Sequence, residues 1–195
     1  NKCEEYRHNL VVNHISKRPQ DCNETIPREL IRKYIFVPVQ KIDDVSVTQY
    51  SKTGMLKFMS NVVHFAKEHN MPVIFKPHPH VIIDREPIAK HIANLKKIYP
   101  EVYSINASIY SLMYKSLFTA CINSGGVVDN FISLTPVFCC GKSIFHKSGS
   151  VVFNNNVDKG LTIMKEEDYD WEGSVDKTEE KTEEAPTPEE ALTWA

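Results

Sequence analysis

The chain of 195 residues is poor in glycine and cysteine and has no long apolar run. Its 7 Gly and 5 Cys exclude a collagen and a disulfide-rich miniprotein. No stretch approaches the roughly 20 apolar residues that span a bilayer, so we expect no membrane helix. Residues 1–20 carry charges throughout, and we expect no signal peptide there. The hydrophobic fraction of 42% is enough for one sizeable core and excludes a wholly disordered chain.

The cysteines are odd in number and include no Cys-x-x-Cys pair. Cys139 and Cys140 lie in an apolar run, which is typical of small buried hydrophobic residues. We therefore expect a reducing, cytoplasmic compartment and no zinc framework. Asn23-Glu-Thr and Asn106-Ala-Ser match the glycan acceptor pattern, but nothing else in the sequence indicates secretion.

Charge is distributed unevenly, although the formal net charge is only −2. Residues 165–195 hold 3 lysines and 12 acidic residues, a net of −9, whereas residues 1–164 hold 20 basic and 13 acidic residues, a net of +7. The basic part either binds an anionic ligand or carries charge that only solvates its surface. The low-complexity stretch 177–190 predicts an acidic tail over residues 166–195, which could include a short terminal helix.

Short apolar runs alternate with segments of helical periodicity. The runs predict strands at residues 34–39, 72–76, 102–105, 117–122 and 136–140, with a further strand near 150–153. Helices are predicted at residues 28–33, 54–70, 88–98, 108–115 and 127–133 and from about residue 157, and a polar loop at 40–53. This alternation predicts an α/β domain over residues 34–165, built on an open, doubly wound parallel sheet, after an N-terminal extension or linker over residues 1–33.

Ligands of such sheets bind outside the carboxyl ends of the strands, so we expect the functional residues to follow the predicted strands. Gln40, Asp43 and Asp44 follow the first predicted strand. A carboxylate at this place could bind hydroxyls or act as a general base. Alternatively, Asp43 or Asp44 caps a turn or a helix.

The stretch Lys76-Pro77-His78-Pro79 follows the second predicted strand. The two prolines hold His78 in an extended loop with little freedom. Lys76 offers a point charge and His78 a directed N–H donor, and both suit a phosphate. A purely structural loop and a metal site that includes His80 are the alternatives.

The turn Asn123-Ser124-Gly125-Gly126 follows the fourth predicted strand and opens a helix. Glycines let the backbone approach a ligand closely, and the start of a helix favours an anion. The turn matches neither a Gly-x-Gly-x-x-Gly nor a Walker pattern, and a plain capped turn has the same geometry. Asp129 could accept the hydroxyls of a ribose or only favour the helix dipole. Lys142 adds a cation after the fifth strand.

Together these stretches resemble the capsule polysaccharide biosynthesis family, which includes Kdo-type transferases of the GT-B fold. The likeness rests on a proline-containing strand followed by an aspartate, a Lys-Pro-His-Pro stretch, a Ser-Ile-x-x-Leu helix, an Asn-Ser turn before an acidic residue, and a Pro-Val strand ending in glycine. These are residues 36–44, 76–79, 108–112, 123–129 and 136–141. Order and spacing agree over about residues 34–146.

The resemblance implies an enzyme, a glycosyltransferase that moves a sugar from a nucleotide-sugar donor to a glycan or polysaccharide acceptor. It implies no metal, no cofactor and no nucleic-acid partner. His78 would be catalytic, with Asp43 or Asp44 as the local candidates for a base. The other implied donor contacts are Lys76 and Ser124 at the phosphate, Asp129 at the ribose, and Gln40, Asn123, Gly125, Gly126 and Lys142 around them.

This sequence departs from the family in three ways, one of which is the stretch Asn130-Phe-Ile-Ser in place of the family's small, helix-forming run. The family's glutamate is replaced by Asp129, which is one methylene shorter. A complete GT-B enzyme has two Rossmann-like halves, and this chain has room for one, the nucleotide-binding half. We expect the acceptor half to come from a partner domain, in residues absent here or in another chain.

Three other functions stay open from the sequence. A polyol-phosphate transferase of the CDP-glycerol type also uses a His-Pro loop and a serine turn followed by aspartate. A non-catalytic nucleotide-binding module would bind nucleotides without transfer. A metal-dependent hydrolase would need bound metal at the histidines, and Asp168-Tyr-Asp170 is a weak second candidate for a metal site.

Overall fold

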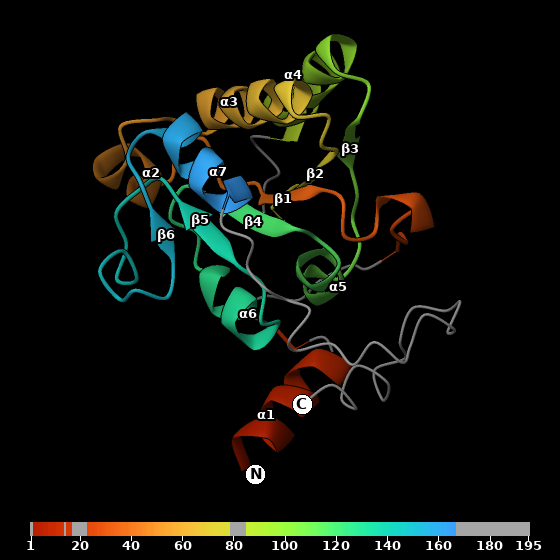
Figure 1. Cartoon of the computed structure of the whole chain (residues 1–195), viewed down its shortest axis with the longest axis vertical. Coiled ribbons are helices and arrows are strands. Elements are labelled where there is room, and N and C mark those ends of the chain that lie inside the picture. Colours follow the sequence, from red (N-terminus) through yellow and green to blue (C-terminus); the bar gives the residue numbers. More distant parts are fainter. Residues whose placement is uncertain (1, 14, 17–22, 79–84, 167–195) are drawn as a thin grey trace.

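The computed structural model describes residues 2–13, 15, 16, 23–78 and 85–166, which form a six-stranded parallel sheet with helices on both faces (Figure 1). The strand order is β3-β2-β1-β4-β5-β6. The strands are β1 (Ile35–Pro38), β2 (Val73–Lys76), β3 (Val102–Ser104), β4 (Phe118–Cys121), β5 (Val137–Cys139) and β6 (Val152–Phe153). This is the Rossmann order, in which the direction of winding reverses between β1 and β4. The predicted fold class is confirmed.

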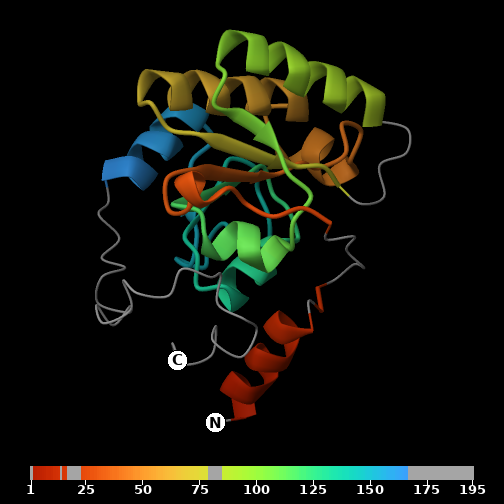
Figure 2. The same cartoon turned by 90° about the vertical axis from the view of Figure 1, so that its right-hand side faces the viewer.

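Helices cover the two faces of the sheet unequally. Figures 1 and 2 show α3, α4 and α7 over one face, α5 and α6 over the other, and α1 projecting from the side of α5 and α6. The helices are α1 (Lys2–Val12), α2 (Val45–Tyr50), α3 (Met55–Glu68), α4 (Arg85–Ile98), α5 (Ile109–Tyr114), α6 (Val127–Ile132) and α7 (Val157–Glu166), with a 3-10 helix at Arg28–Leu30. None of these described helices combines the length and apolar character needed to cross a bilayer.

The central strand β1 shows why the sheet is covered on both sides. Ile35 and Val37 belong to the core under α3, α4 and α7, whereas Tyr34 and Phe36 belong to the core on the side of α5. All four side chains are fully buried. Each buried large apolar side chain contributes about 1.5–3 kcal/mol, so both faces of the strand favour a sheet between two helical layers.

The structure corrects one prediction from the sequence. The segment 40–53, predicted as a polar loop, contains helix α2. Asp44 is its N-cap, and the Asp44 side chain accepts a hydrogen bond from Ser46 N at 2.9 Å. This cap satisfies one amide that would otherwise lack a partner, and it stabilises a short helix whose β-branched residues have low helix propensity.

The cysteines of the sheet are buried thiols, as their apolar surroundings predict. Cys121 and Cys139 stand opposite each other in the β4–β5 register, with 3.6 Å between their sulfur atoms. Cys140 follows them, and all three are free and buried. Burial, together with the neighbouring Cys121, raises the pKa of Cys140 to about 12.

We expect stability to depend on Cys140 at alkaline pH. The folded thiol stays neutral up to about pH 12, whereas the unfolded thiol loses its proton around its ordinary pKa of 9.0. The stabilising effect is therefore complete below pH 9 and is lost as the pH rises toward 12, by at most about 1.4 kcal/mol per pH unit. Urea unfolding between pH 8 and 11 should show a shallower loss of stability in Cys140→Ala. An identical pH dependence in the variant would contradict this assignment.

Candidate functional site

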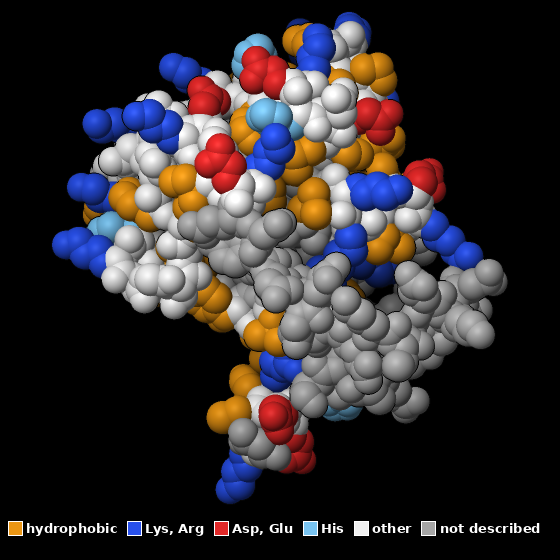
Figure 3. Space-filling model, viewed as in Figure 1, with side chains coloured by type: hydrophobic (Ala, Val, Ile, Leu, Met, Phe, Trp, Pro, Cys, Tyr) orange, Lys and Arg blue, Asp and Glu red, His pale blue; other side chains and the backbone are white. Residues whose placement is uncertain are grey.

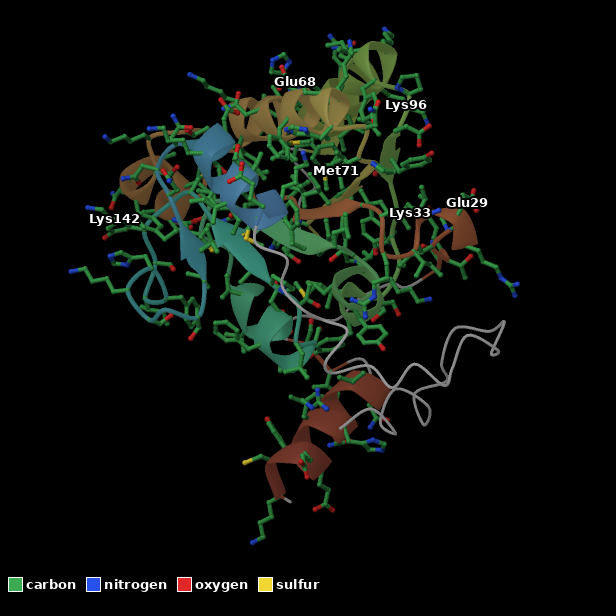
Figure 4. All side chains as sticks on the ribbon, in the orientation of Figure 1. Glu29, Lys33, Glu68, Met71, Lys96 and Lys142 are labelled. Carbon is green, nitrogen blue, oxygen red and sulfur yellow. The ribbon has the colours of Figure 1, made fainter. Side chains whose placement is uncertain are left out.

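The polar loops predicted as a site lie along one edge of the sheet. The carboxyl ends of all six parallel strands share that edge, and β1 is the only strand between β2 and β4 in the sheet order. The ends of β2 and β4 are therefore two strand spacings, roughly 10 Å, apart. Figure 4 shows Lys142, which follows β5, at the end of the sheet where α2 lies, and Glu29 and Lys33, which precede β1, at the opposite end. Because β2 and β4 are the two neighbours of β1, the His78 loop after β2 and the Ser124 turn after β4 flank β1 on the same edge.

Lys76 is the last residue of β2 and is buried, with 6% of its surface exposed. Its Nζ donates to Asn106 Oδ1 at 2.8 Å and to the Ala107 carbonyl at 2.7 Å. The ammonium group therefore joins the end of β2 to the loop that leads from β3 into α5. His78 lies two residues further on and is half-buried. The pair brings a buried positive charge and an imidazole to the edge of the sheet.

Ser124 begins the turn between β4 and α6. Its Oγ accepts a hydrogen bond from Gly126 N at 3.1 Å, which closes a tight turn and leaves the hydroxyl proton to donate. Gly125 is exposed at the tip of this turn. A Cβ on Gly126 would lie 3.3 Å from Ser124 Oγ, so the turn has little room for a larger residue.

Asp129 lies in α6 and turns its carboxylate toward α5. The side chain is 6% exposed, and Oδ2 lies 3.8 Å from where a Cβ on Gly126 would be. Tyr110 of α5 lies beside it and donates to the carbonyl of Ile15 at 2.7 Å. Burial and the Asp129 charge raise the pKa of Tyr110 above its usual range. The carboxylate predicted to bind ribose therefore stands next to the Ser124 turn, with a neutral tyrosine as its neighbour.

Asp43 and Asp44 stand before α2, beside the end of β1. Asp43 is exposed, and Asp44 is half-buried. The capping role, which the sequence left open, is confirmed for Asp44 by its bond to Ser46 N. A role for either residue as a base stays a prediction.

Gln40 and Asn123 turn inward between the ends of β1 and β4. They are 6% and 8% exposed, and Gln40 Nε2 donates to Asn123 Oδ1 at 3.0 Å. Ser46 Oγ also donates to Asn123 Oδ1, at 3.2 Å. The two side chains therefore contact each other and the start of α2.

The loop after β5 packs closely against α2 and the end of β4. Lys142 donates its backbone N–H to the carbonyl of Tyr50 at 2.8 Å, which brings the loop after β5 against the end of α2. A Cβ on Gly141 would lie 2.8 Å from Ile122 Cγ2, so only glycine fits this close contact without a shift.

The same edge is rich in positive charge. Figure 3 shows Lys and Arg side chains gathered at this side of the molecule (left). Four lysines of these loops are exposed: Lys41, Lys52, Lys142 and Lys147.

Two residues of this edge were missed in the sequence. Ser46 belongs to the segment that the sequence predicts as a polar loop. It lies in α2, where its Oγ donates a hydrogen bond to Asn123 Oδ1. Asn106 was noted only for its glycan acceptor pattern, yet it accepts from Lys76. Its position directly after the third predicted strand was the signal that could have found it, because ligand-binding loops follow the strands.

Both candidate metal sites that the sequence offered include residues outside the described part of the chain, so both stay untested. Among residues 2–13, 15, 16, 23–78 and 85–166, no group of three or more His, Cys, Asp and Glu side chains is placed to hold a metal ion. His80 and the Asp168-Tyr-Asp170 stretch lie outside the described residues, as does most of the predicted acidic tail.

The sequence matches the family described as Capsule polysaccharide biosynthesis protein over residues 4–162. No curated protein matches it by direct comparison. Among solved structures it is similar to the Thermosulfurimonas dismutans KpsC beta Kdo 2,4 transferase, with a TM-score of 0.52 and 18% identity over 82% of this chain and 50% of that one. The beta Kdo 2,7 transferase of the same KpsC gives a TM-score of 0.49 and 20% identity over 78% of this chain and 46% of that one.

A Methanocaldococcus jannaschii UDP-GlcNAc 2-epimerase, solved in complex with UDP-GlcNAc and UDP, is similar with a TM-score of 0.48 and 14% identity. That match covers 84% of this chain and 43% of the epimerase. The chain therefore spans about half the length of the solved structures it resembles. At this identity the likeness to the 2,4 transferase shows a shared fold.

Proposed function

Because the chain belongs to the capsule polysaccharide biosynthesis family, we propose that it is the nucleotide-sugar-binding domain of a glycosyltransferase. The observation that carries this proposal is the shared edge of the sheet, where the His78 loop and the Ser124 turn flank β1. An imidazole, a hydroxyl and a buried ammonium group there suit the phosphates of a nucleotide-sugar. The similar structure that is named as a beta Kdo 2,4 transferase supports the same class of reaction.

The proposed reaction breaks the bond between the anomeric carbon of the donor sugar and the phosphate oxygen. A new glycosidic bond forms between that carbon and a hydroxyl oxygen of a glycan acceptor. Negative charge develops on the leaving phosphate, and positively polarised groups that are already in place lower the energy of this state. The reaction so proposed needs no metal ion.

The titratable and hydroxyl side chains His78, Ser124, Lys76 and Asp129 each have a part in this proposal. His78 donates a proton to the leaving phosphate oxygen, and the Ser124 hydroxyl donates a hydrogen bond to the same phosphate. Lys76, whose Nζ is held by the loop after β3, supplies buried positive charge. Asp129 accepts from the ribose hydroxyls. The proton of the acceptor hydroxyl goes to Asp43 or Asp44, or to a base in the acceptor half.

The proposal predicts that one nucleotide donor stabilises the protein. Thermal unfolding is measured with UDP-, GDP- and CMP-linked sugars and with CDP-glycerol. A ligand at 100 times its Kd stabilises the folded state by about 2.7 kcal/mol. For a chain of this size that corresponds to a rise in Tm of about 5–10 °C.

Ser124→Ala should reduce this rise, because the loss of a hydrogen bond to a charged phosphate weakens binding about tenfold or more. Ser60→Ala on α3 is the matched control and should keep the full rise. A response to CDP-glycerol alone would favour the polyol-phosphate transferase. The absence of a response to every donor would reject the proposed function.

A further inference from the structure

The backbone ladder between the two central strands, β1 and β4, ends before the strands do, at the point where the winding of the sheet reverses; we call the unpaired stretch the β1–β4 gap. β1 pairs with β2 as far as Pro38, but with β4 only through Ile35 and Phe36. Along a strand, successive backbone amides point toward opposite neighbouring strands. The amides of Ile35 and Val39 donate toward β2, so an amide at position 38 would point toward β4. Proline has no N–H to give there. The β1–β4 ladder therefore lacks the hydrogen bond that an amide at position 38 would donate.

A pair of side chains bridges this gap. Gln40 Nε2 donates to Asn123 Oδ1 at 3.0 Å, and the backbone amide of Asn123 donates to Gln40 Oε1 at 3.2 Å. The carboxamide of Gln40 thus exchanges two hydrogen bonds with the chain leaving β4, as a neighbouring strand would do. Both side chains are more than nine-tenths buried, so water competes little for these bonds.

Asn123 extends the bridge to two more loops. Its Nδ2 donates to the Ser46 carbonyl at 2.6 Å and to the Lys142 carbonyl at 3.2 Å, and its Oδ1 accepts from Ser46 Oγ as well as from Gln40. An asparagine side chain has two N–H donors and an oxygen with two lone pairs. All four are engaged within the protein, which leaves the side chain no group with which to bind a ligand.

We propose that Gln40 and Asn123 are positioning residues that form a clamp across the β1–β4 gap, and that the Asn123 side chain, whose hydrogen-bonding groups are all engaged, does not contact the donor. The clamp fixes the Ser124 turn, the start of α2 and the loop after β5 relative to one another. In this proposal, positioning replaces the donor contact that the sequence predicted for Asn123. The binding measurement below rests on the proposed function, whereas the exchange measurement does not.

A double-mutant cycle distinguishes a clamp from two separate ligand contacts. The affinities for CMP, CDP, UDP and GDP are measured for Gln40→Met, Asn123→Ala and the double variant. If the residues act as one clamp, each single variant weakens binding about tenfold and the double variant does so to nearly the same extent. If each touches the nucleotide, the losses multiply to about a hundredfold, which would overturn the proposal. Thr48→Ala, at an exposed position of α2, is the control and should bind as the wild type does.

Amide hydrogen exchange tests the clamp without a nucleotide. Loss of either side chain should speed exchange in both the α2 segment and the loop after β5, and the double variant should add little. Faster exchange confined to one of these segments would overturn the clamp. If the wild-type protein binds none of the four nucleotides, the proposed function fails, and the exchange result alone decides on the clamp.

Discussion

Replacing His78 by alanine is expected to lower donor turnover by a hundredfold or more. The proposed reaction leaves negative charge on a phosphate oxygen, and a positioned acid that protonates it contributes about 10²–10⁴-fold to the rate. His78 is suited to this part because it lies two residues after Lys76, the buried last residue of β2, on the edge that carries the Ser124 turn. Turnover is measured as release of nucleoside phosphate from the donor that stabilises the protein most.

His64 offers a matched control for this substitution. It lies on the outer face of α3, where its Nε2 is 3.3 Å from Glu68 Oε1 and its side chain is 74% exposed. His64→Ala removes an imidazole of the same chemistry far from the proposed site, and it should leave turnover within about twofold because surface changes have small effects. Equal turnover in His78→Ala and the wild type would reject His78 as the acid.

Replacing Gly160 by alanine is expected to destabilise the fold by about 2 kcal/mol. Gly160 is where α7 packs against the sheet, and a Cβ there would lie 2.0 Å from Cε2 of the fully buried Phe138. Alanine is the better helix former by about 1 kcal/mol, but a clash with a ring held in the core outweighs that gain. Thermal unfolding should show a Tm lowered by about 4–8 °C.

Two further variants test the expected destabilisation by Gly160→Ala, one as a control and one as a rescue. A Cβ on Gly54, at the start of α3, would meet no atom within 4 Å, so Gly54→Ala should change the Tm little. In a Phe138→Leu background the ring is absent, and Gly160→Ala should lower the Tm by less there than in the wild type. If Gly160→Ala were as stable as Gly54→Ala, α7 would not pack as described.

The parallel sheet could be predicted because its signal is local. Each strand is covered on both faces, so it appears in the sequence as a short continuous apolar run. Helix α3 was predicted to within two residues of its observed ends because its buried residues recur at helical spacing. Helix α2 was missed for the opposite reason: only Val47 of its six residues is buried, and its formation depends on the Asp44 cap.

The candidate site was predictable in position but not in contacts. The sequence placed Lys76, His78, Ser124 and Asp129 after strands, and parallel strands bring such residues to one edge whatever their separation along the chain. It could not show that Lys76 is engaged by Asn106 and the Ala107 carbonyl, some 30 residues away.

The sequence by itself thus determined the layered α/β class, the edge of the sheet on which the candidate site residues lie and the kind of groups gathered there. The tertiary structure decided which of those groups face inward. Gln40 and Asn123 are 83 residues apart, and an amide can bond equally well to a ligand or to a neighbouring loop. Only the packing of β1 against β4, with a proline at the gap, fixes that choice, because a buried amide must find its partners within reach.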